Sequence, residues 1–448
     1  MAGEPPSASP DAAAAASPPV ASKASPTLPV TRPAVRPWAG GALASRDFRL
    51  LLVMQLASGV RQPMLFFAQA WYVNLAAPPS QRVVLLGLLG AIRGAVFLAY
   101  ALVGGAVADR FPRRRTLVAS HAVAVLLSSG IALLLYVPAV ARGEGPWLWA
   151  MFPLFASFGL ITGQDQPTRT AMVRDAVPTV ALTSAVTLHQ FAMSLAFIPA
   201  APLVGWMLDE LGVATTYLLS GLGHLIVIGA AFAMRSPDVV ADPGARGESV
   251  WSNLRAGFGV VREDPVVRWT IYLTWLVLAA GMSVMSVLIA AWVHDVLGLD
   301  ASGWGWMALF WGIGGILASG WLAWQGEYGR KGQLFLGASA LMGTSVLAFG
   351  LSRSIAPAFL FNGLAGLANA LVLTVGIAIV QQAVPNRLLG RVTALLMLSQ
   401  GIMQLTGLLV GAAGQLLGLS AIYPAAGIAI LVFTLLTALR QRPLRTAA

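Results

Sequence analysis

Long apolar stretches separated by short polar segments recur from about residue 48 to residue 439 of the chain. Each has about the 20 residues that an α-helix needs to cross the hydrocarbon core of a bilayer. Because lipid offers no partners to backbone N–H and C=O groups, continuous apolar stretches of this length are expected to be helices. The pattern predicts twelve spans, over residues 48–76, 83–108, 116–138, 147–166, 181–208, 213–234, 268–293, 302–325, 333–352, 355–381, 392–417 and 420–439.

Composition leads to the same class of protein. Of the 448 residues, 57% are hydrophobic and only 10% are charged, whereas a soluble domain carries about 25% charged residues. We therefore expect an all-α integral membrane protein that crosses the bilayer many times. The absence of cysteine excludes disulfides and Cys-ligated metal sites. The sequence shows no nucleophile elbow, metal cluster or phosphate-binding loop, so we expect no enzyme activity, no cofactor and no metal.

The basic residues are distributed unevenly among the predicted loops. Arg82, Arg142 and Arg353 fall in loops on one side of the membrane, and Arg61 and Arg93 fall within spans. The other 23 of the 28 Lys and Arg residues fall in segments on the opposite side. Because cytoplasmic loops are enriched in Lys and Arg, both termini are predicted to be cytoplasmic. The net charge of +11 does not indicate nucleic-acid binding, since these residues sit in short loops rather than on one basic face.

The polar segments divide the chain into parts. The first is rich in Ala, Pro and Ser and is predicted to be disordered. The linker between the sixth and seventh spans contains "ESVWSNLRAGFGVVREDP", which predicts a Ser249-capped amphipathic helix with Trp251, Leu254, Phe258 and Val261 on one side. This helix would lie along the inner membrane surface; a plain connector is the alternative. The predicted parts are a cytoplasmic tail at 1–44, six-helix bundles at 45–234 and 268–440, the linker at 235–267, and a short tail at 441–448.

The two halves of the chain resemble one another. The fifth span is preceded by "AVP", ending at Pro178, and ends at "LG", with Gly212. The eleventh span is preceded by "AVP", ending at Pro385, and ends at "LG", with Gly418. These matches indicate two six-helix pseudo-repeats, an arrangement typical of secondary transporters.

The segment after the second span carries a recognisable motif. "GGAVADRFPRRRTL" resembles the loop between the second and third helices of the major facilitator superfamily, with a proline where a glycine is common. A glycine lets a neighbouring helix approach closely, and an aspartate can face the N-terminus of an adjacent helix. The motif positions are Gly105, Asp109, Arg110, Arg113 and Arg114.

Further stretches resemble the drug:proton antiporter branch of that superfamily, which includes the enterobactin exporter. They are "TGQDQPTRTAMVRDAVP", "VPNRLLGRV", and "AAPLVGW", which keeps Pro202 and Gly205 of a Gly-Pro-x-x-Gly motif in the fifth span. The resemblance implies an inner gate in the outward-open state, in which Asp109 faces the start of the eleventh span and Arg113 pairs with Asp165.

A polar stripe runs along the first span. Gln55, Ser58, Gln62 and Gln69 follow helical spacing, and Arg61 lies at the edge of the stripe. A charge at mid-bilayer costs about 2.5–3.5 kcal/mol on insertion scales and usually faces a bundle interior or a wet cavity. We expect this stripe to line a substrate cavity, although interhelical hydrogen bonding is an alternative. Similar candidates in other spans are Thr187, Gln190, Asn362, Asn369, Gln400 and Gln404, with Met282, Met285, Trp304, Trp306 and Trp311 as apolar contacts or ordinary packing.

Charge inside the membrane also bears on coupling. None of the 17 Asp and Glu residues lies in the middle of a predicted span, which leaves Arg61 without an obvious counter-charge. We therefore expect Arg61 to meet an anionic group of the cargo. Arg93, His121 and His189 are candidates for a coupling role, and His224 lies in the sixth span; histidine titrates near neutral pH. Structural hydrogen bonding is the alternative for each.

The resemblance implies a secondary active transporter that exports small amphiphilic, siderophore-like or drug-like molecules across the cytoplasmic membrane by alternating access. The expected partners are a small-molecule substrate, membrane lipids and protons, with the chain acting as a monomer. A lipid or lysolipid flippase is the alternative within transport, and a non-transporting membrane sensor is the alternative from another class.

Overall fold

The computed structural model describes residue 3 and residues 41–108, 112–163, 165–236, 238, 250–326 and 329–446. All regular secondary structure in these residues is helical, which confirms the predicted fold class. Ten helices among the described residues are long and apolar enough to cross a membrane. The predicted tail at 1–44 lies almost wholly outside the described residues, as do residues 239–249 of the linker.

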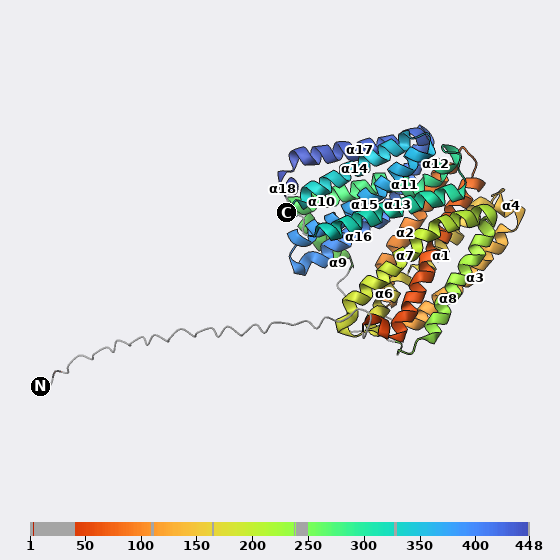
Figure 1. Ribbon diagram of the computed structural model, residues 1–448, viewed down its shortest axis with the longest axis horizontal. Coiled ribbons are helices and arrows are strands. Elements are labelled where there is room, and N and C mark those ends of the chain that lie inside the picture. The colour runs from red at the N-terminus through yellow and green to blue at the C-terminus, as the bar shows by residue number, and fades with distance from the viewer. Residues whose placement is uncertain are drawn as a thin grey trace.

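The helices of the first half form one bundle, red to yellow-green in Figure 1. Ser45 caps the first of them, because its side chain accepts a hydrogen bond from the amide of Phe48. The N-terminal bundle consists of η1 (Ala42–Ala44), α1 (Arg46–Ala76), α2 (Arg82–Ala108), α3 (Arg113–Leu135), α4 (Pro138–Ala141), α5 (Trp147–Thr162), α6 (Asp165–Ala176), η2 (Thr179–Ala181), α7 (Leu182–Glu210) and α8 (Gly212–Ala233).

The helices of the second half form another bundle, green to blue in Figure 1. Its first span is broken by a π-helical turn, η3 (Val277–Met282), and again near Leu288. The linker helix is α9 (Val250–Glu263), and the C-terminal bundle consists of α10 (Pro265–Leu276), η3 (Val277–Met282), α11 (Ser283–Val287), α12 (Ile289–Asp295), α13 (Ala301–Gln325), α14 (Lys331–Leu351), α15 (Ile355–Ala383), α16 (Asn386–Leu417), α17 (Leu419–Arg440) and α18 (Arg442–Arg445).

Each predicted span is matched in position by a helix or a run of consecutive helices. The fourth corresponds to α5, with 16 residues, and the eleventh to α16, with 32 residues. These two are not among the ten candidate spans, so the number twelve stays a prediction.

Corresponding segments of the two halves share local structure as well as sequence. Pro178 and Pro385 both precede a helix in an extended conformation. Gly212 and Gly418 both have positive φ, +76° and +85°, where the chain turns from one helix into the next. Residues with a side chain rarely adopt this conformation, which explains a glycine at both positions.

The two bundles meet closely at one end. We call this end the distal end. The opposite end, where α1 begins and α17 ends, is called the proximal end. A Cβ at Gly205 of α7 would lie 2.5 Å from the carbonyl oxygen of Ala301, and one at Gly305 of α13 would lie 2.5 Å from that of Ala201. A Cβ at Gly87 of α2 would lie 2.9 Å from Cα of Gly411 in α16. Glycine therefore permits backbone contact between the bundles at two interfaces, α7 with α13 and α2 with α16.

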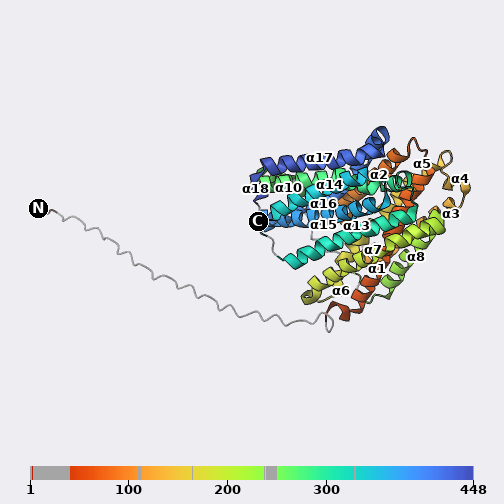
Figure 2. The same cartoon turned by 45° about the horizontal axis from the view of Figure 1, so that its top comes forward.

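Polar contacts join the same ends. Arg82 and Asp295 form an ion pair at 2.5 Å, and the carboxylate of Asp209 accepts hydrogen bonds from the amides of Ala301 (2.9 Å) and Ser302 (2.7 Å) at the start of α13. The proximal ends diverge, with α6 and α18 well apart in both views (Figures 1 and 2). The structure is thus closed distally.

Candidate transport cavity and buried charge cluster

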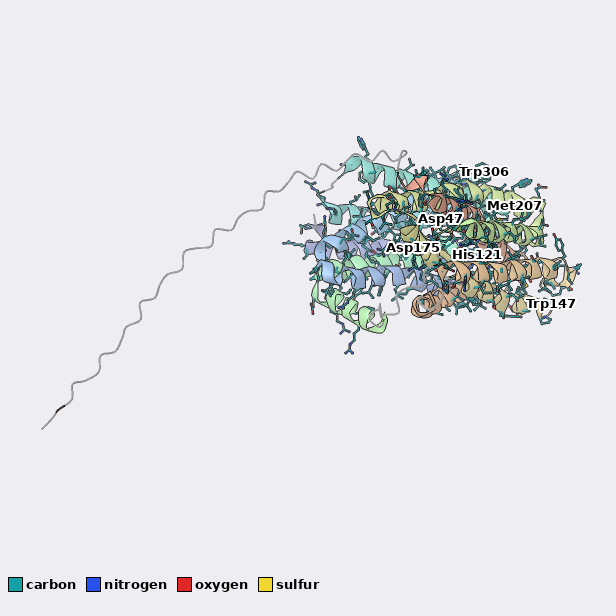
Figure 3. All side chains as sticks on the ribbon, turned by 90° about the horizontal axis from the view of Figure 1, so that it is seen from below. Asp47, His121, Trp147, Asp175, Met207 and Trp306 are labelled. Carbon is teal, nitrogen blue, oxygen red and sulfur yellow. The ribbon has the colours of Figure 1, made fainter. Side chains whose placement is uncertain are left out.

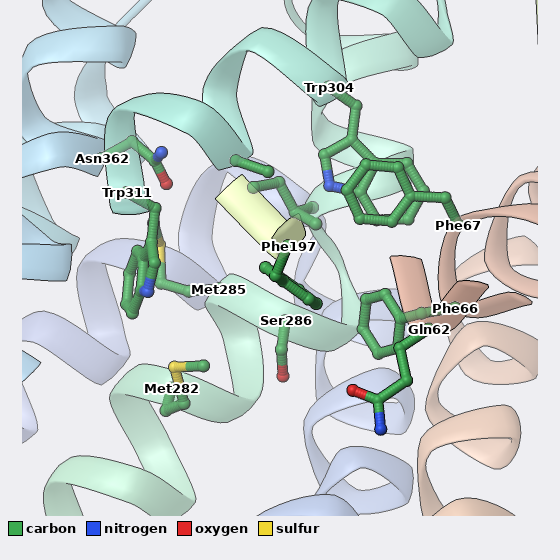
Figure 4. Close-up of a pocket in the computed structure, with 12 residues that line it drawn as sticks. Gln62, Phe66, Phe67, Phe197, Met282, Met285, Ser286, Trp304, Trp311 and Asn362 are labelled. Atoms are coloured by element: carbon green, nitrogen blue, oxygen red, sulfur yellow. The ribbon is translucent and has the colours of Figure 1, made fainter. Parts of the chain in front are cut away.

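A cavity of about 330 Å³ lies between the two bundles (Figure 4). Helices α1 and α7 supply one wall, and the segment from η3 to α13 together with α15 supplies the other. Both halves of the chain therefore contribute to one site. Its lining residues are Gln62, Phe66, Phe67, Phe197, Met282, Met285, Ser286, Ile289, Trp304, Ala308, Trp311 and Asn362.

Aromatic and methionine side chains dominate the cavity. The rings of Phe67 and Trp304 stack across the bundle interface, with centroids 4.1 Å apart and planes inclined by 13°. Met282 ends the π-helical turn η3 and Met285 lies in the following helix; π-turns often occur at functional sites. Methionine adapts to irregular ligands and aromatic rings provide rigid apolar contact, so the lining can accommodate apolar surface of varied shape.

Few polar groups reach the cavity. They belong to Gln62, Ser286 and Asn362. The amide of Asn362 donates to the carbonyl of Met307 at 2.6 Å, while its Oδ1 is buried without a hydrogen-bond partner among the described residues. None of the described lining residues is charged. The cavity therefore offers hydrogen bonds but no direct ion pair.

The structure places the predicted cavity residues in different environments. Gln62, Asn362, Met282, Met285, Trp304 and Trp311 line the cavity, whereas Trp306 is 52% exposed on the outer face of α13. Gln190 is exposed on α7 and accepts a hydrogen bond from Gln166 at 3.3 Å. The predicted cavity residues that do not line it are Gln55, Ser58, Arg61, Thr187, Gln190, Asn369, Gln400 and Gln404.

Arg61 lies inside the N-terminal bundle rather than in the cavity, so the prediction for it was wrong. It is only 3% exposed, and its Nη2 donates to Asp165 Oδ2 at 2.9 Å and to Ser58 Oγ at 3.4 Å. The absence of a counter-charge was also wrong, because Asp165 is 3% exposed where α6 begins. Arg61 is therefore neutralised within the protein and is not available to an anionic cargo.

Arg169 completes a buried charge cluster that the sequence reasoning missed. Its Nε lies 2.7 Å from Asp165 Oδ1, and its Nη1 donates to Gln55 Oε1 at 2.7 Å and to the carbonyl of Met54 at 3.1 Å. Gln55 and Ser58 serve this cluster instead of lining the cavity. The spacing of four residues between Asp165 and Arg169 was the available signal, since such residues share a helix face.

Two histidines adjoin the cluster. His121 Nε2 lies 3.2 Å from Asp165 Oδ1, and His121 Nδ1 lies 2.9 Å from His224 Nδ1. Figure 3 shows His121 within the bundle, between Trp147 at the distal end and Asp175 toward the proximal end. His189 of α7 is also buried, and its Nε2 has no hydrogen-bond partner among the described residues.

Arg93 does not line the cavity but contacts Phe66, which does. Its Nε and Nη2 donate to Gln69 Oε1 at 3.1 and 2.8 Å, Nη2 also donates to the carbonyl of Phe66 at 3.0 Å, and its guanidinium lies 4.3 Å from the Phe66 ring centroid. Among the described residues it has no acidic partner. Arg93 is thus a cation in contact with a lining residue, Phe66, and no carboxylate among the described residues neutralises it.

The loop-2/3 motif is only partly described. Asp109 and Arg110 lie outside the described residues, and Gly105 lies in α2. In this distally closed structure Arg113 pairs with Asp175 at 2.8 Å. The pair with Asp165, expected for the outward-open state, is absent here because Asp165 is buried at the start of α6 beside Arg61. Arg114 donates to the carbonyls of Met234 and Phe232 where α8 ends, at 2.9 and 3.0 Å.

Pro202 and Gly205 lie at the contact between α7 and α13. A Cβ at Gly305 would meet Cα of Pro202 at 2.9 Å, and Gly205 faces Ala301. This motif therefore belongs to the distal closure rather than to the cavity.

The sequence matches the family model of the Major Facilitator Superfamily over residues 51–361. A search of curated proteins finds no match.

Several solved transporters share the fold. A bacterial homologue of the human lysosomal transporter Spinster, in an inward-facing and unoccupied conformation, has 16% sequence identity and a TM-score of 0.62, with 88% of this chain and 96% of that chain covered. A POT family transporter in complex with 5-aminolevulinic acid has 12% identity and a TM-score of 0.68, covering 89% and 97%. Another POT structure, with a thioalcohol-conjugated peptide, has 12% identity and a TM-score of 0.69, covering 89% and 96%. At these identities the likeness concerns the fold.

Proposed function

Because the chain belongs to the Major Facilitator Superfamily, we propose that it exports small amphiphilic molecules across the cytoplasmic membrane by alternating access, driven by protons. The observation that carries this proposal is the cavity between the two bundles, closed distally and lined by both halves of the chain. A site shared by two bundles can face either side of the membrane as they rock against each other.

Orientation in the membrane follows from charge. If the Lys- and Arg-rich loops are cytoplasmic, the proximal end faces the cytoplasm and the distal closure faces outward. The structure then corresponds to an inward-facing state that is ready to take cargo from the cytoplasm. Export as the direction of transport rests on the resemblance to the antiporter branch.

The lining supports an amphiphilic cargo. Phe66, Phe67, Trp304, Met282 and Met285 favour an apolar or aromatic body, and Gln62 and Asn362 can hydrogen-bond a polar end. Siderophore-like and drug-like molecules have this character. An anionic cargo would depend on Arg93 rather than on Arg61, because Arg61 is already paired with Asp165.

A binding experiment tests the cavity. N-phenyl-1-naphthylamine and 1-anilinonaphthalene-8-sulfonate differ by one sulfonate, so fluorescence titration of the purified protein with both separates neutral from anionic recognition; rhodamine 6G serves as a cationic probe. Trp304→Ala should lower the affinity for the probe that binds best by about tenfold, since loss of a buried aromatic contact removes apolar area and stacking.

Trp306→Ala is the matched control, because Trp306 lies two residues away and is 52% exposed, whereas Trp304 is 2% exposed. Equal affinities of the two variants for all three probes would show that the cavity is not their binding site. Preference for the sulfonate that disappears in Arg93→Gln would identify anionic cargo.

A flippase is the second candidate, favoured by an apolar groove of about 550 Å³ between α13 and α15. Phe310 lines this groove, while its neighbour Trp311 lines the cavity. Movement of a fluorescent lysolipid between the leaflets of proteoliposomes, without transfer of soluble probes, would favour this function.

A further inference from the structure

The imidazoles of His121 in α3 and His224 in α8 are paired inside the N-terminal bundle. Their Nδ1 atoms are 2.9 Å apart, and the two residues are 1% and 0% exposed. Two imidazole nitrogens at this distance form a hydrogen bond only when one carries a proton and the other offers its lone pair. The pair therefore holds a single proton between the two Nδ1 atoms.

Asp165 determines which imidazole donates. His121 Nε2 lies 3.2 Å from Asp165 Oδ1, in a contact that lacks the geometry of a hydrogen bond. The negative charge of the carboxylate at this distance still favours a proton on Nε2 over a lone pair. The Nδ1 of neutral His121 is then the acceptor, and His224 donates through its own Nδ1. His224 Nε2 is left with a lone pair, and it is buried without a hydrogen-bond partner among the described residues. With a proton on His121 Nε2, which also lacks a hydrogen-bond partner among the described residues, His224 Nε2 carries the one unused lone pair of the two imidazoles.

Each carboxylate oxygen of Asp165 lies within ion-pair distance of a guanidinium group. Asp165 pairs with Arg61 of α1 at 2.9 Å and with Arg169 of α6 at 2.7 Å. From α7, His189 interacts electrostatically with the same aspartate and with Arg169. With neutral imidazoles, the two guanidinium groups and one carboxylate carry a net charge of +1. Protonation of Asp165 would leave both guanidinium groups without a counter-charge, so an added proton belongs on an imidazole.

The C-terminal bundle offers no comparable group. The buried polar side chains that the structure describes in α10–α17 are Ser, Thr and Asn, with no buried Asp, Glu, His, Lys or Arg. Titratable chemistry in the described interior is therefore concentrated in the N-terminal half.

We propose that the His121–His224 pair is the site that binds and releases one coupling proton per transport cycle. The proton binds the lone pair of His224 Nε2 and forms an N–H bond, and release breaks the same bond. A second proton would place hydrogens on both Nδ1 atoms and abolish their hydrogen bond, so the pair accepts one. This inference rests on the proposed function for its role in transport, but proton binding itself does not.

A physical link joins this pair to the cavity. His121 contacts Asp165, Asp165 pairs with Arg61, and the next residue of α1, Gln62, lines the cavity. An added positive charge on the pair competes with Arg61 for Asp165 and biases the position of α1. Because coupling between two sites is reciprocal, cargo at Gln62 alters proton binding by the same factor.

Infrared difference spectroscopy of the full chain in liposomes tests the proton site without any cargo. The protein carries only four histidines, so the His189→Asn/His294→Asn variant with isotope-labelled histidine reports on the pair alone. We expect uptake of one proton per protein when the pH is lowered. Two protons, or none, would overturn the proposal.

His224→Asn supplies the decisive variant. Asparagine can still donate a hydrogen bond toward His121 Nδ1 but has no titratable nitrogen, so the proton step should disappear while the melting temperature changes little. An unchanged proton step would reject the assignment. If the variant fails to fold, His224→Gln and His121→Gln repeat the measurement. His294→Asn alone, which removes an exposed imidazole near the distal surface, should leave the step intact.

A flux measurement separates this inference from the proposed function. Proteoliposomes containing the wild type should accumulate rhodamine 6G against its gradient when a proton gradient is applied, and His224→Asn should permit only downhill exchange. Absence of flux in the wild type, together with a normal proton step, would contradict transport of this probe and leave the proton site standing. Gradient-driven accumulation by His224→Asn would overturn the coupling role.

Discussion

Arg61 and Asp165 form an ion pair at 2.9 Å although 104 residues separate them in the chain. Each is only 3% exposed. The pair joins α1 to α6 within the N-terminal bundle and is shared with Arg169, which lies 2.7 Å from the other carboxylate oxygen. Because of this contact, the charge of Arg61 is neutralised inside the bundle and links two helices, and it is not presented to the cavity.

The charge count of this cluster predicts unequal effects of its variants. Arg61→Gln leaves Asp165 and Arg169 as a balanced pair, whereas Asp165→Asn leaves two buried guanidinium groups unpaired. Breaking a buried pair by removing one partner costs about 3–5 kcal/mol, and Asp165→Asn should reach this range while Arg61→Gln costs clearly less. Thermal unfolding in detergent measures both. Equal losses, or a larger loss for Arg61→Gln, would contradict the arrangement.

The ion pair between Arg82 and Asp295 should hold the distal closure. It is partly exposed and links the two bundles at 2.5 Å, and such pairs contribute about 0–1 kcal/mol. Asp295→Asn should therefore shift the ratio of distally open to closed molecules by up to about fivefold. The chain has no native cysteine, so spin labels at Gln81→Cys and Ser354→Cys can report the distance between bundles. The charge swap Arg82→Asp/Asp295→Arg should restore closure; no rescue would indicate that the pair does not act as a latch.

Gly205 should be intolerant of any side chain. An added Cβ would lie 2.5 Å from the carbonyl oxygen of Ala301, so α7 and α13 must separate. Overpacking of this kind costs about 1–3 kcal/mol. Gly205→Ala should widen the distal spin-label distance and lower the melting temperature. Gly229→Ala is the control, because a Cβ there meets nothing within 4 Å; the two variants should behave differently.

Arg114 and Arg115 are adjacent but should differ in importance. The guanidinium of Arg114 donates to two carbonyls where α8 ends, which have no helical partners of their own, whereas the side chain of Arg115 is 84% exposed. Arg114→Ala should lower the free energy of unfolding by about 1–3 kcal/mol, and Arg115→Ala should leave it nearly unchanged. Similar melting temperatures for both variants would argue against the capping role.

Much of the fold could be predicted because its determinants are local. Apolar length identifies a span wherever lipid is the solvent. Gly212 and Gly418 stand where one helix turns into the next, because their positive φ suits glycine. The candidate site was harder to predict. Gln62 and Asn362 were assigned to the cavity from polar spacing, but the same spacing also selected Gln55 and Ser58, which are buried beside Arg169.

The sequence by itself determined which segments are helices, where they turn, and that the chain crosses a membrane, because these properties depend on neighbouring residues and on the solvent. Only the tertiary structure decided which face of each helix meets which partner. Successive residues of an α-helix project about 100° apart, so Gln62 reaches the cavity while Arg61 points into the bundle toward Asp165. The location of that carboxylate depends on the packing of α6 against α1, a contact across 104 residues that no local pattern specifies.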